Sequence, residues 1–115
     1  MAGGIFYLKY RDTLPIMQVT LRNPDGTVFD LTSSTIRKLH IMLDSGTTLT
    51  RDMAIVGAPT AGVVQYAWLT SDWNAGGLVT GSHQMEYEIV SGAARLTFPN
   101  DGHDFLRITG DIGQG

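Results

Sequence analysis

The sequence predicts an all-β protein, a two-layer antiparallel sandwich of about seven to nine short strands. Turn signals built from Gly, Pro, Asn and Asp recur along its 115 residues, and the stretches between them have the length of strands. Most of those stretches alternate apolar and polar side chains, which is typical of sheets with one buried and one wet face. No apolar stripe of helical period runs for three or more turns, so the helices that a parallel sheet needs are not expected.

Each expected strand is a short run that ends at a turn. In the clearest run, Met85, Tyr87 and Ile89 are expected to face the core, while the polar residues between them face solvent. The turn at 23–26 contains a proline, which presets φ, and a glycine, which accepts a positive φ. In chain order, the strands are expected over 5–10, 16–22, 28–29, 35–43, 53–56, 63–68, 83–90, 95–98 and 105–109, with a short helical turn at 31–34.

One uncharged segment, Met53 to Ser71, has nearly the length of a membrane-spanning helix. Its middle contains Pro59 and two glycines, which break or weaken a helix, so two strands joined by a turn are expected instead of a bilayer span. No repeat, charge run or linker divides the chain. We therefore expect a single domain over 1–115, with an ordered core over about 5–109 and a loose, glycine-rich tail over 110–115.

Composition excludes several classes of function. The 8 Lys and Arg against 11 Asp and Glu give a net charge of -3, which argues against a nucleic-acid partner. The chain has no cysteine, so it contains no disulfide, thiolate metal site or cysteine nucleophile, and a reducing cytosol is the expected folding compartment. The first residues lack the basic and apolar runs of a secretory signal.

No residue pattern points to catalysis or to a cofactor. His40, His83 and His103 are widely spaced, without acidic partners at metal-motif spacing, and are interpreted as surface or strand-end residues. Glu86 and Glu88 share the solvent face of one expected strand. There is no Gly-x-Ser-x-Gly elbow. We expect no catalytic, metal or cofactor-binding residue, and no enzyme activity.

The first expected strand is apolar on both faces. Burial on both sides explains this composition, and so does a partner that covers one face; as an edge strand it would also be an open template for pairing. Trp68 is in phase with core residues, whereas Trp73 lies in a turn-like segment where it either stacks on a sugar or caps one end of the sandwich. The candidate partner-binding residues are Ile5, Phe6, Tyr7, Leu8, Tyr10 and Trp73.

Several segments together carry a family resemblance. They are D-L-T at 30–32, G-V-V-x-Y-x-W at 62–68 and F-P-N-D-G at 98–102, with supporting runs at 14–21, 23–29 and 84–89. In this order and spacing, the chain resembles the immunoglobulin-like N-terminal domain of bacteriophage baseplate upper proteins. The resemblance extends from about Phe6 to Ile108. Two features depart from the pattern: larger members continue into a receptor-related region after the domain, and His103 stands where a larger aromatic residue is expected.

The resemblance implies an immunoglobulin-like β-sandwich in a phage virion, assembled in the host cytoplasm. Its implied role is attachment to neighbouring tail, baseplate, connector or capsid proteins, without catalysis, as a homo-oligomer or symmetric array. From composition and motifs, we expect no cofactor, no nucleic acid and no membrane partner. The alternative is a carbohydrate-binding or host-cell-surface-binding module on the virion, with a host-surface glycan held by Trp73.

Overall fold

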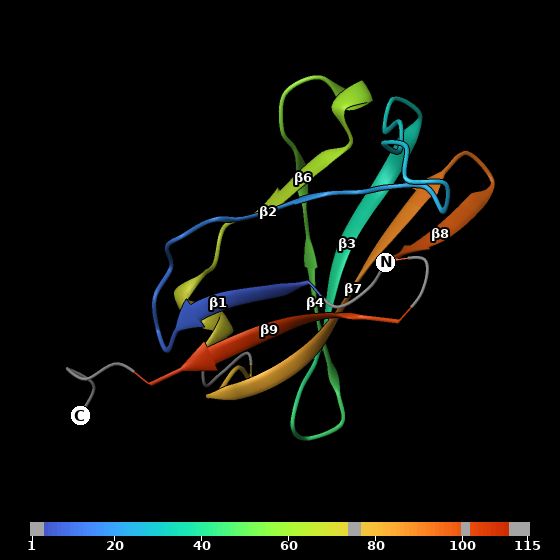
Figure 1. The fold of residues 1–115 in the computed structure, drawn as a ribbon. Helices are drawn as coiled ribbons and strands as arrows, with labels where there is room; N and C mark the ends of the chain where they lie inside the picture. The colour runs from blue at the N-terminus through green and yellow to red at the C-terminus, as the bar shows by residue number, and fades with distance from the viewer. Residues whose placement is uncertain (1–3, 74–76, 100–101, 111–115) are drawn as a thin grey trace.

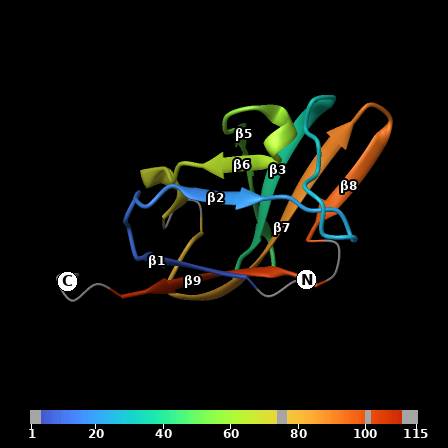
Figure 2. The same cartoon turned by 45° about the horizontal axis from the view of Figure 1, so that its top comes forward.

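The protein folds as an all-β sandwich, in agreement with the sequence. The computed structural model describes residues 4–73, 77–99 and 102–110. Within them, six strands form one sheet and three form the other; Figure 2 shows β2, β5 and β6 as one layer and β1 and β9 in the layer beneath it. The elements are β1 (Ile5–Lys9), β2 (Met17–Thr20), β3 (Ser34–Met42), β4 (Thr48–Asp52), β5 (Ala54–Ile55), η1 (Pro59–Ala61), β6 (Val63–Tyr66), η2 (Thr70–Asp72), β7 (Gly81–Ser91), β8 (Ala94–Phe98) and β9 (Asp104–Thr109).

The long strand β7 organises the six-stranded sheet and runs across the whole molecule (Figure 1). Its first half, 81–85, pairs with β9, and its second half, 87–91, pairs with β8. Both partners lie on the edge of β7 opposite β3, in the strand order β1-β9-β7-β3-β4. The three-stranded sheet has the order β2-β6-β5. Strands β1 and β2 are therefore terminal strands of their respective sheets.

One strand pair is parallel, which the expectation of a purely antiparallel sandwich missed. β1 pairs with β9 from Ile5 opposite Phe105 to Lys9 opposite Thr109. No crossover helix is needed because the two strands come from opposite ends of the chain, with the rest of the sandwich connecting them.

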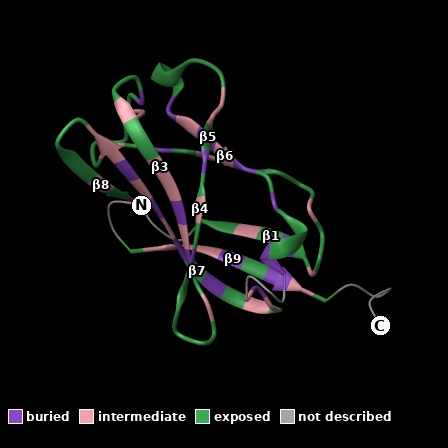
Figure 3. Ribbon diagram, turned by 180° about the vertical axis from the view of Figure 1, so that it is seen from behind, coloured by how far each residue is buried: buried purple, intermediate pink, exposed green. Residues whose placement is uncertain are grey.

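The expected alternation of buried and exposed side chains is confirmed (Figure 3). On β7, Met85, Tyr87 and Ile89 are buried, and Trp68 lies in the core after β6 as predicted. The segment 53–71 forms β5 and β6, joined by a turn that includes η1. In the described part of the chain, no helix is long and apolar enough to cross a membrane.

Three elements differ from the expectation. Strand β4 (Thr48–Asp52) was not expected; its residues pair with residues 38–42 of β3. Val28 and Phe29 do not form a strand; Val28 makes only an isolated bridge with Arg22. The segment 31–34 makes one turn, in which the Ser34 N–H donates to the Leu31 carbonyl oxygen at 3.0 Å, but no helix follows because β3 starts at Ser34. The predicted loose tail lies outside the described residues from position 111 onward.

A buried carboxylate fastens the two sheets together. Asp72, in η2, accepts hydrogen bonds from Arg51 Nε of β4 at 2.7 Å and from the Tyr66 hydroxyl of β6 at 2.6 Å. The Leu69 N–H also donates to it, at 2.9 Å. Burial, followed by the bond to Asp72, raises the pKa of Tyr66, so this phenol stays a neutral donor. The chain between β6 and β7 is thereby held against β4.

Candidate partner-binding site

The candidate site is the open side of the sandwich, defined as the terminal strands β1 and β2 together with the space between them. A cavity of about 160 Å³ lies between the start of β1 and β2, lined by Ile5, Phe6 and Met17 among others. β1 contains no proline and one charged residue, Lys9, although charge and proline are common protections of a free sheet edge. β1 is therefore weakly protected against pairing with another chain.

The structure divides the predicted partner-binding residues of β1 between two faces. Ile5 and Tyr7 point outward, and they are 53% and 64% exposed. Leu8 points inward and is only 2% exposed, so its prediction as a partner contact is wrong. Phe6 is half-buried and packs against Trp68, with 6.1 Å between the ring centroids. Packing in the core therefore explains the apolar residues on the inner face of β1. It does not explain Ile5 and Tyr7, which are exposed on the outer face.

Trp73 is part of the core, so the expectation of an exposed sugar-stacking ring is wrong. Its exposed fraction is 4%, and its ring meets Tyr10 edge-on with 5.3 Å between centroids. The predicted alternative, a cap at one end of the sandwich, agrees with this position. Tyr10, another predicted partner contact, is half-buried in the same aromatic pair. Neither ring offers a free face of the kind that stacks on a glycan.

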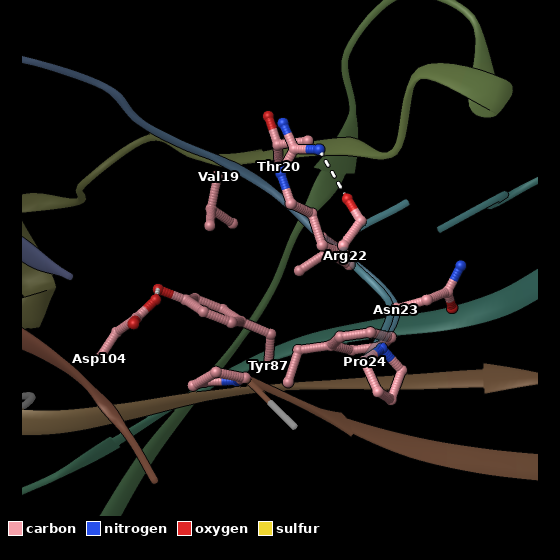
Figure 4. Close-up of a pocket in the computed structure, with 11 residues that line it drawn as sticks. Val19, Thr20, Arg22, Asn23, Pro24, Tyr87 and Asp104 are labelled. Atoms are coloured by element: carbon pink, nitrogen blue, oxygen red, sulfur yellow. Dashed lines mark hydrogen bonds between the residues drawn. The ribbon is translucent and has the colours of Figure 1, made fainter. Parts of the chain in front are cut away.

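A second cavity opens along β2. It has a volume of about 460 Å³ and lies between β2 with its following turn and the sheet formed by β7, β8 and β9 (Figure 4). Val19, Tyr87 and Asp104 line this cavity and also the smaller one near β1. The two cavities therefore adjoin one another, and we call them together the intersheet groove.

The floor of the intersheet groove carries a hydrogen-bonded carboxylate. The Tyr87 hydroxyl donates to Asp104 Oδ2 at 2.9 Å, and the Gly4 N–H donates to Oδ1 at 3.2 Å. Burial, followed by the negative charge of Asp104, raises the pKa of Tyr87, so the phenol is held as a donor. Figure 4 shows the Tyr87 ring running across the floor toward Asp104.

The far end of the groove is a fixed turn. The Arg22 guanidinium donates to the Gly26 carbonyl oxygen at 3.1 Å, and the Asn23 amide donates to Thr27 Oγ1 at 3.1 Å. Asp25 accepts from both the N–H and the hydroxyl of Thr27. These bonds hold the predicted 23–26 turn in place at the rim, so the groove has a carboxylate at one end and a guanidinium at the other.

The three histidines lie outside the groove. His40 Nε2 contacts Glu88 at 2.7 Å and His103 Nε2 contacts Glu86 at 3.3 Å, both on the outer face of the larger sheet. The hydrogen bond with His40, together with the nearby Arg95, lowers the pKa of Glu88. No group of three metal-ligating side chains occurs among the described residues.

His83 lies near the start of β7, which agrees with the predicted strand-end position, and its side chain is buried, with 2% exposed. Its ring nitrogens lie 2.8 Å from the Val79 carbonyl oxygen and 3.2 Å from that of Met42. These carbonyls supply the polar partners that allow an imidazole to sit among core residues. His83 is thus a structural residue at the start of β7.

Sequence reasoning did not find the groove or its carboxylate. Asp104 follows the stretch Asn-Asp-Gly at 100–102, whose composition predicts a turn and does not indicate a binding role. Its contact with Tyr87 spans 17 positions and depends on how β9 pairs with β7. No local pattern encodes that pairing.

Comparison with known proteins shows that this chain is similar in fold to two solved structures. No family model and no curated protein matches the sequence. The endo-beta-1,4-mannanase from Thermotoga petrophila aligns over 95% of this chain with a TM-score of 0.53 and 14% identity, and this chain spans 18% of that protein. CopC from Methylosinus trichosporium OB3b aligns over 100% of this chain and 91% of its own, with a TM-score of 0.53 and 8% identity. At such identities the similarity concerns the fold alone.

Proposed function

We propose that this protein is a non-enzymatic structural component of a bacteriophage virion, which attaches to neighbouring tail, baseplate, connector or capsid proteins. The single observation that carries the attachment role is the exposed apolar face of a terminal strand, formed by Ile5 and Tyr7 on β1. The resemblance of segments 30–32, 62–68 and 98–102 to phage baseplate domains supports the virion setting.

Two features of β1 favour contact with another protein chain. A terminal strand presents backbone N–H and C=O groups that another chain can pair with, and exposed aromatic and aliphatic side chains add area that is favourable to bury. Tyrosine is enriched at protein interfaces because its ring is apolar and its hydroxyl stays hydrogen-bonded. β1 combines both features over five residues.

The non-enzymatic part of the proposal rests on the sequence, which contains neither cysteine nor a Gly-x-Ser-x-Gly elbow. The alternative role in glycan binding depended on an exposed Trp73, and that side chain is buried. A buried Trp73 leaves the glycan role without the exposed ring on which a sugar would stack.

The virion setting is tested by immunodetection in particles. An antibody raised against the protein should detect it in purified virions released from cells that express its gene, at a constant ratio to the major structural proteins. Purified particles that lack the protein would refute the virion role.

The β1 contact is tested by photo-crosslinking in assembled particles. The photo-reactive amino acid p-benzoylphenylalanine replaces Tyr7, or replaces Leu69 as a matched control, since Leu69 is also about half exposed but lies after β6. We expect a crosslinked product of defined mass from position 7 and none from position 69. Equal crosslinking at both positions, or none at position 7, would contradict the role of β1. Mass spectrometry of the product then distinguishes a second copy of this chain from another virion protein.

A further inference from the structure

We infer that the intersheet groove binds an extended peptide segment of a neighbouring protein, which pairs with the free edge of β2 and places a Lys or Arg side chain against Asp104. The inference rests on the proposed function, since it names the chemistry of a partner at the open side of the sandwich. Three observations carry it: the edge of β2, the carboxylate in the groove, and the size and polarity of the cavity.

β2 offers one edge for strand addition. Its residues Met17 to Thr20 pair with β6, and in the described part of the chain no strand pairs with the other edge. Gln18 and Thr20 are exposed, whereas Val19 is half-buried and lines the groove. A strand added beside β2 would extend the three-stranded sheet, and every second side chain of it would point toward the groove.

Asp104 supplies the selectivity for a cation. None of the ion pairs of the described residues includes Asp104, although all eight Lys and Arg residues lie in the described part of the chain. Tyr87 and Gly4 orient both carboxylate oxygens. Because the carboxylate sits in a groove between two sheets, a cation beside it is less screened than at an open surface.

The groove suits a long side chain with a charged end. A volume of about 460 Å³ is within the range of roughly 300–1,000 Å³ for sites that hold small ligands. The stem of a lysine or arginine would pass along Val19, Phe98 and the Tyr87 ring before its charge reaches Asp104. Arg22 lines the other end of the groove, where its guanidinium donates to the Gly26 carbonyl oxygen.

The test is a binding titration with a defined peptide set, followed by NMR on the ¹⁵N-labelled full chain. The peptides are nonapeptides with blocked ends that alternate valine and threonine, and their central residue is lysine, arginine, norleucine or glutamate. We expect the lysine and arginine peptides to bind about tenfold more tightly than the norleucine peptide, and to shift the amide signals of β2 and of Asp104. The glutamate peptide should bind most weakly.

The control variant is Asp104→Asn, which keeps an acceptor for the Tyr87 hydroxyl but removes the charge. It should bind all four peptides with affinities within about twofold of one another. If no peptide binds the unmodified protein, if norleucine or glutamate is preferred, or if the shifts fall outside β2 and the groove, the inference is wrong. The peptide comparison on the unmodified protein decides this even if the variant does not fold.

The two proposals fail in different ways. If the protein prefers basic peptides but is absent from virions, the virion setting is wrong and the proposed peptide site in the groove is still supported. Presence in virions without peptide selectivity would overturn the groove site alone.

Discussion

Asp72 is a single polar residue that links the two sheets of the sandwich. The side chain is fully buried, and its two oxygens accept hydrogen bonds from β4, from β6 and from the backbone of Leu69. Removing Asp72 would leave the buried Tyr66 hydroxyl and the Leu69 N–H without an acceptor, and the partly exposed Arg51 without its partner. Unpaired buried donors cost more than the intact interactions contribute. The bond to Asp72 also raises the pKa of Arg51, so the guanidinium stays charged.

We expect Asp72→Ala to lower the free energy of unfolding by about 3–5 kcal/mol in urea denaturation. The matched control is Asp52→Ala, because Asp52 also pairs with a basic residue, Lys38, but its side chain is 83% exposed. That variant should leave the unfolding midpoint unchanged. Similar effects of the two substitutions would show that the Asp72 network does not hold the sheets together.

Residues outside regular strands were the hardest to predict. Alternation predicted the burial of Met85, Tyr87 and Ile89 correctly. Trp73 lies in the connection after η2, where no period applies, and its burial depends on Tyr10, which is more than sixty positions away. Loop residues of this kind take their environment from the tertiary fold, so the local sequence does not specify whether they face solvent.

At the scale of elements, β1 has two faces with different roles. Leu8 belongs to the core, whereas Tyr7 next to it is exposed. We expect Leu8→Ala to lower the free energy of unfolding by about 2–4 kcal/mol, because it leaves a cavity in the core. Tyr7→Ala should change it by less than about 1 kcal/mol. Urea denaturation of both variants is the measurement, and a large loss from Tyr7→Ala would mean that the outer face of β1 serves folding instead of attachment.

The turn before β6 depends on a glycine at a close approach of two segments. Gly62 has φ +69, and an added Cβ would lie 2.7 Å from the Phe29 carbonyl oxygen and would also overlap Val28. We expect Gly62→Ala to cost about 3 kcal/mol or more, since both strain and overlap act. Gly92→Ala is the control, because Gly92 has φ +60 with no atom near its Cβ position, and strain alone should cost about 1–2 kcal/mol. Equal thermal unfolding midpoints for the two variants would contradict the close approach.

Most strands were predicted from short runs between turn signals, but β4 (Thr48–Asp52) was not, although Leu49 is buried between two exposed threonines. β7 and β6 were recognised because their periods are regular. Val28 did not become a strand, because its only ladder contact is with Arg22. The parallel direction of β1 was not predictable, since pairing direction depends on β9 at the other end of the chain.

For the whole molecule, the sandwich class followed from turn spacing and alternation, but the intersheet groove did not. The groove exists because β2 and the β7–β9 region belong to different sheets that separate at one side. Its chemistry then depends on Asp104 meeting Tyr87 across that gap. Such a site depends on how the two sheets are stacked. Patterns within single strands do not specify this stacking, so they do not predict the groove.

The stacking of the two sheets also predicts how the molecule responds to alkaline pH. Tyr66 and Tyr87 are both buried, and burial raises the pKa of each phenol above the ordinary value of about 10. Below pH ~10 both the folded and the unfolded protein keep these protons, so the stabilisation is fully present. Above it the unfolded chain loses them while the folded protein does not, so stability falls by up to about 1.4 kcal/mol per pH unit for each tyrosine.

Urea denaturation between pH 9 and 11.5 measures this fall. Because Tyr66 contributes to the same fall, the comparison that isolates Tyr87 is the slope of the Tyr87→Phe variant against that of the unmodified protein. We expect the variant to lose stability less steeply with pH, whatever its stability at pH 7. Parallel slopes would mean that the Tyr87 hydroxyl ionises in the folded protein, in which case the floor of the intersheet groove would be open to water and Tyr87 would not be a fixed donor to Asp104.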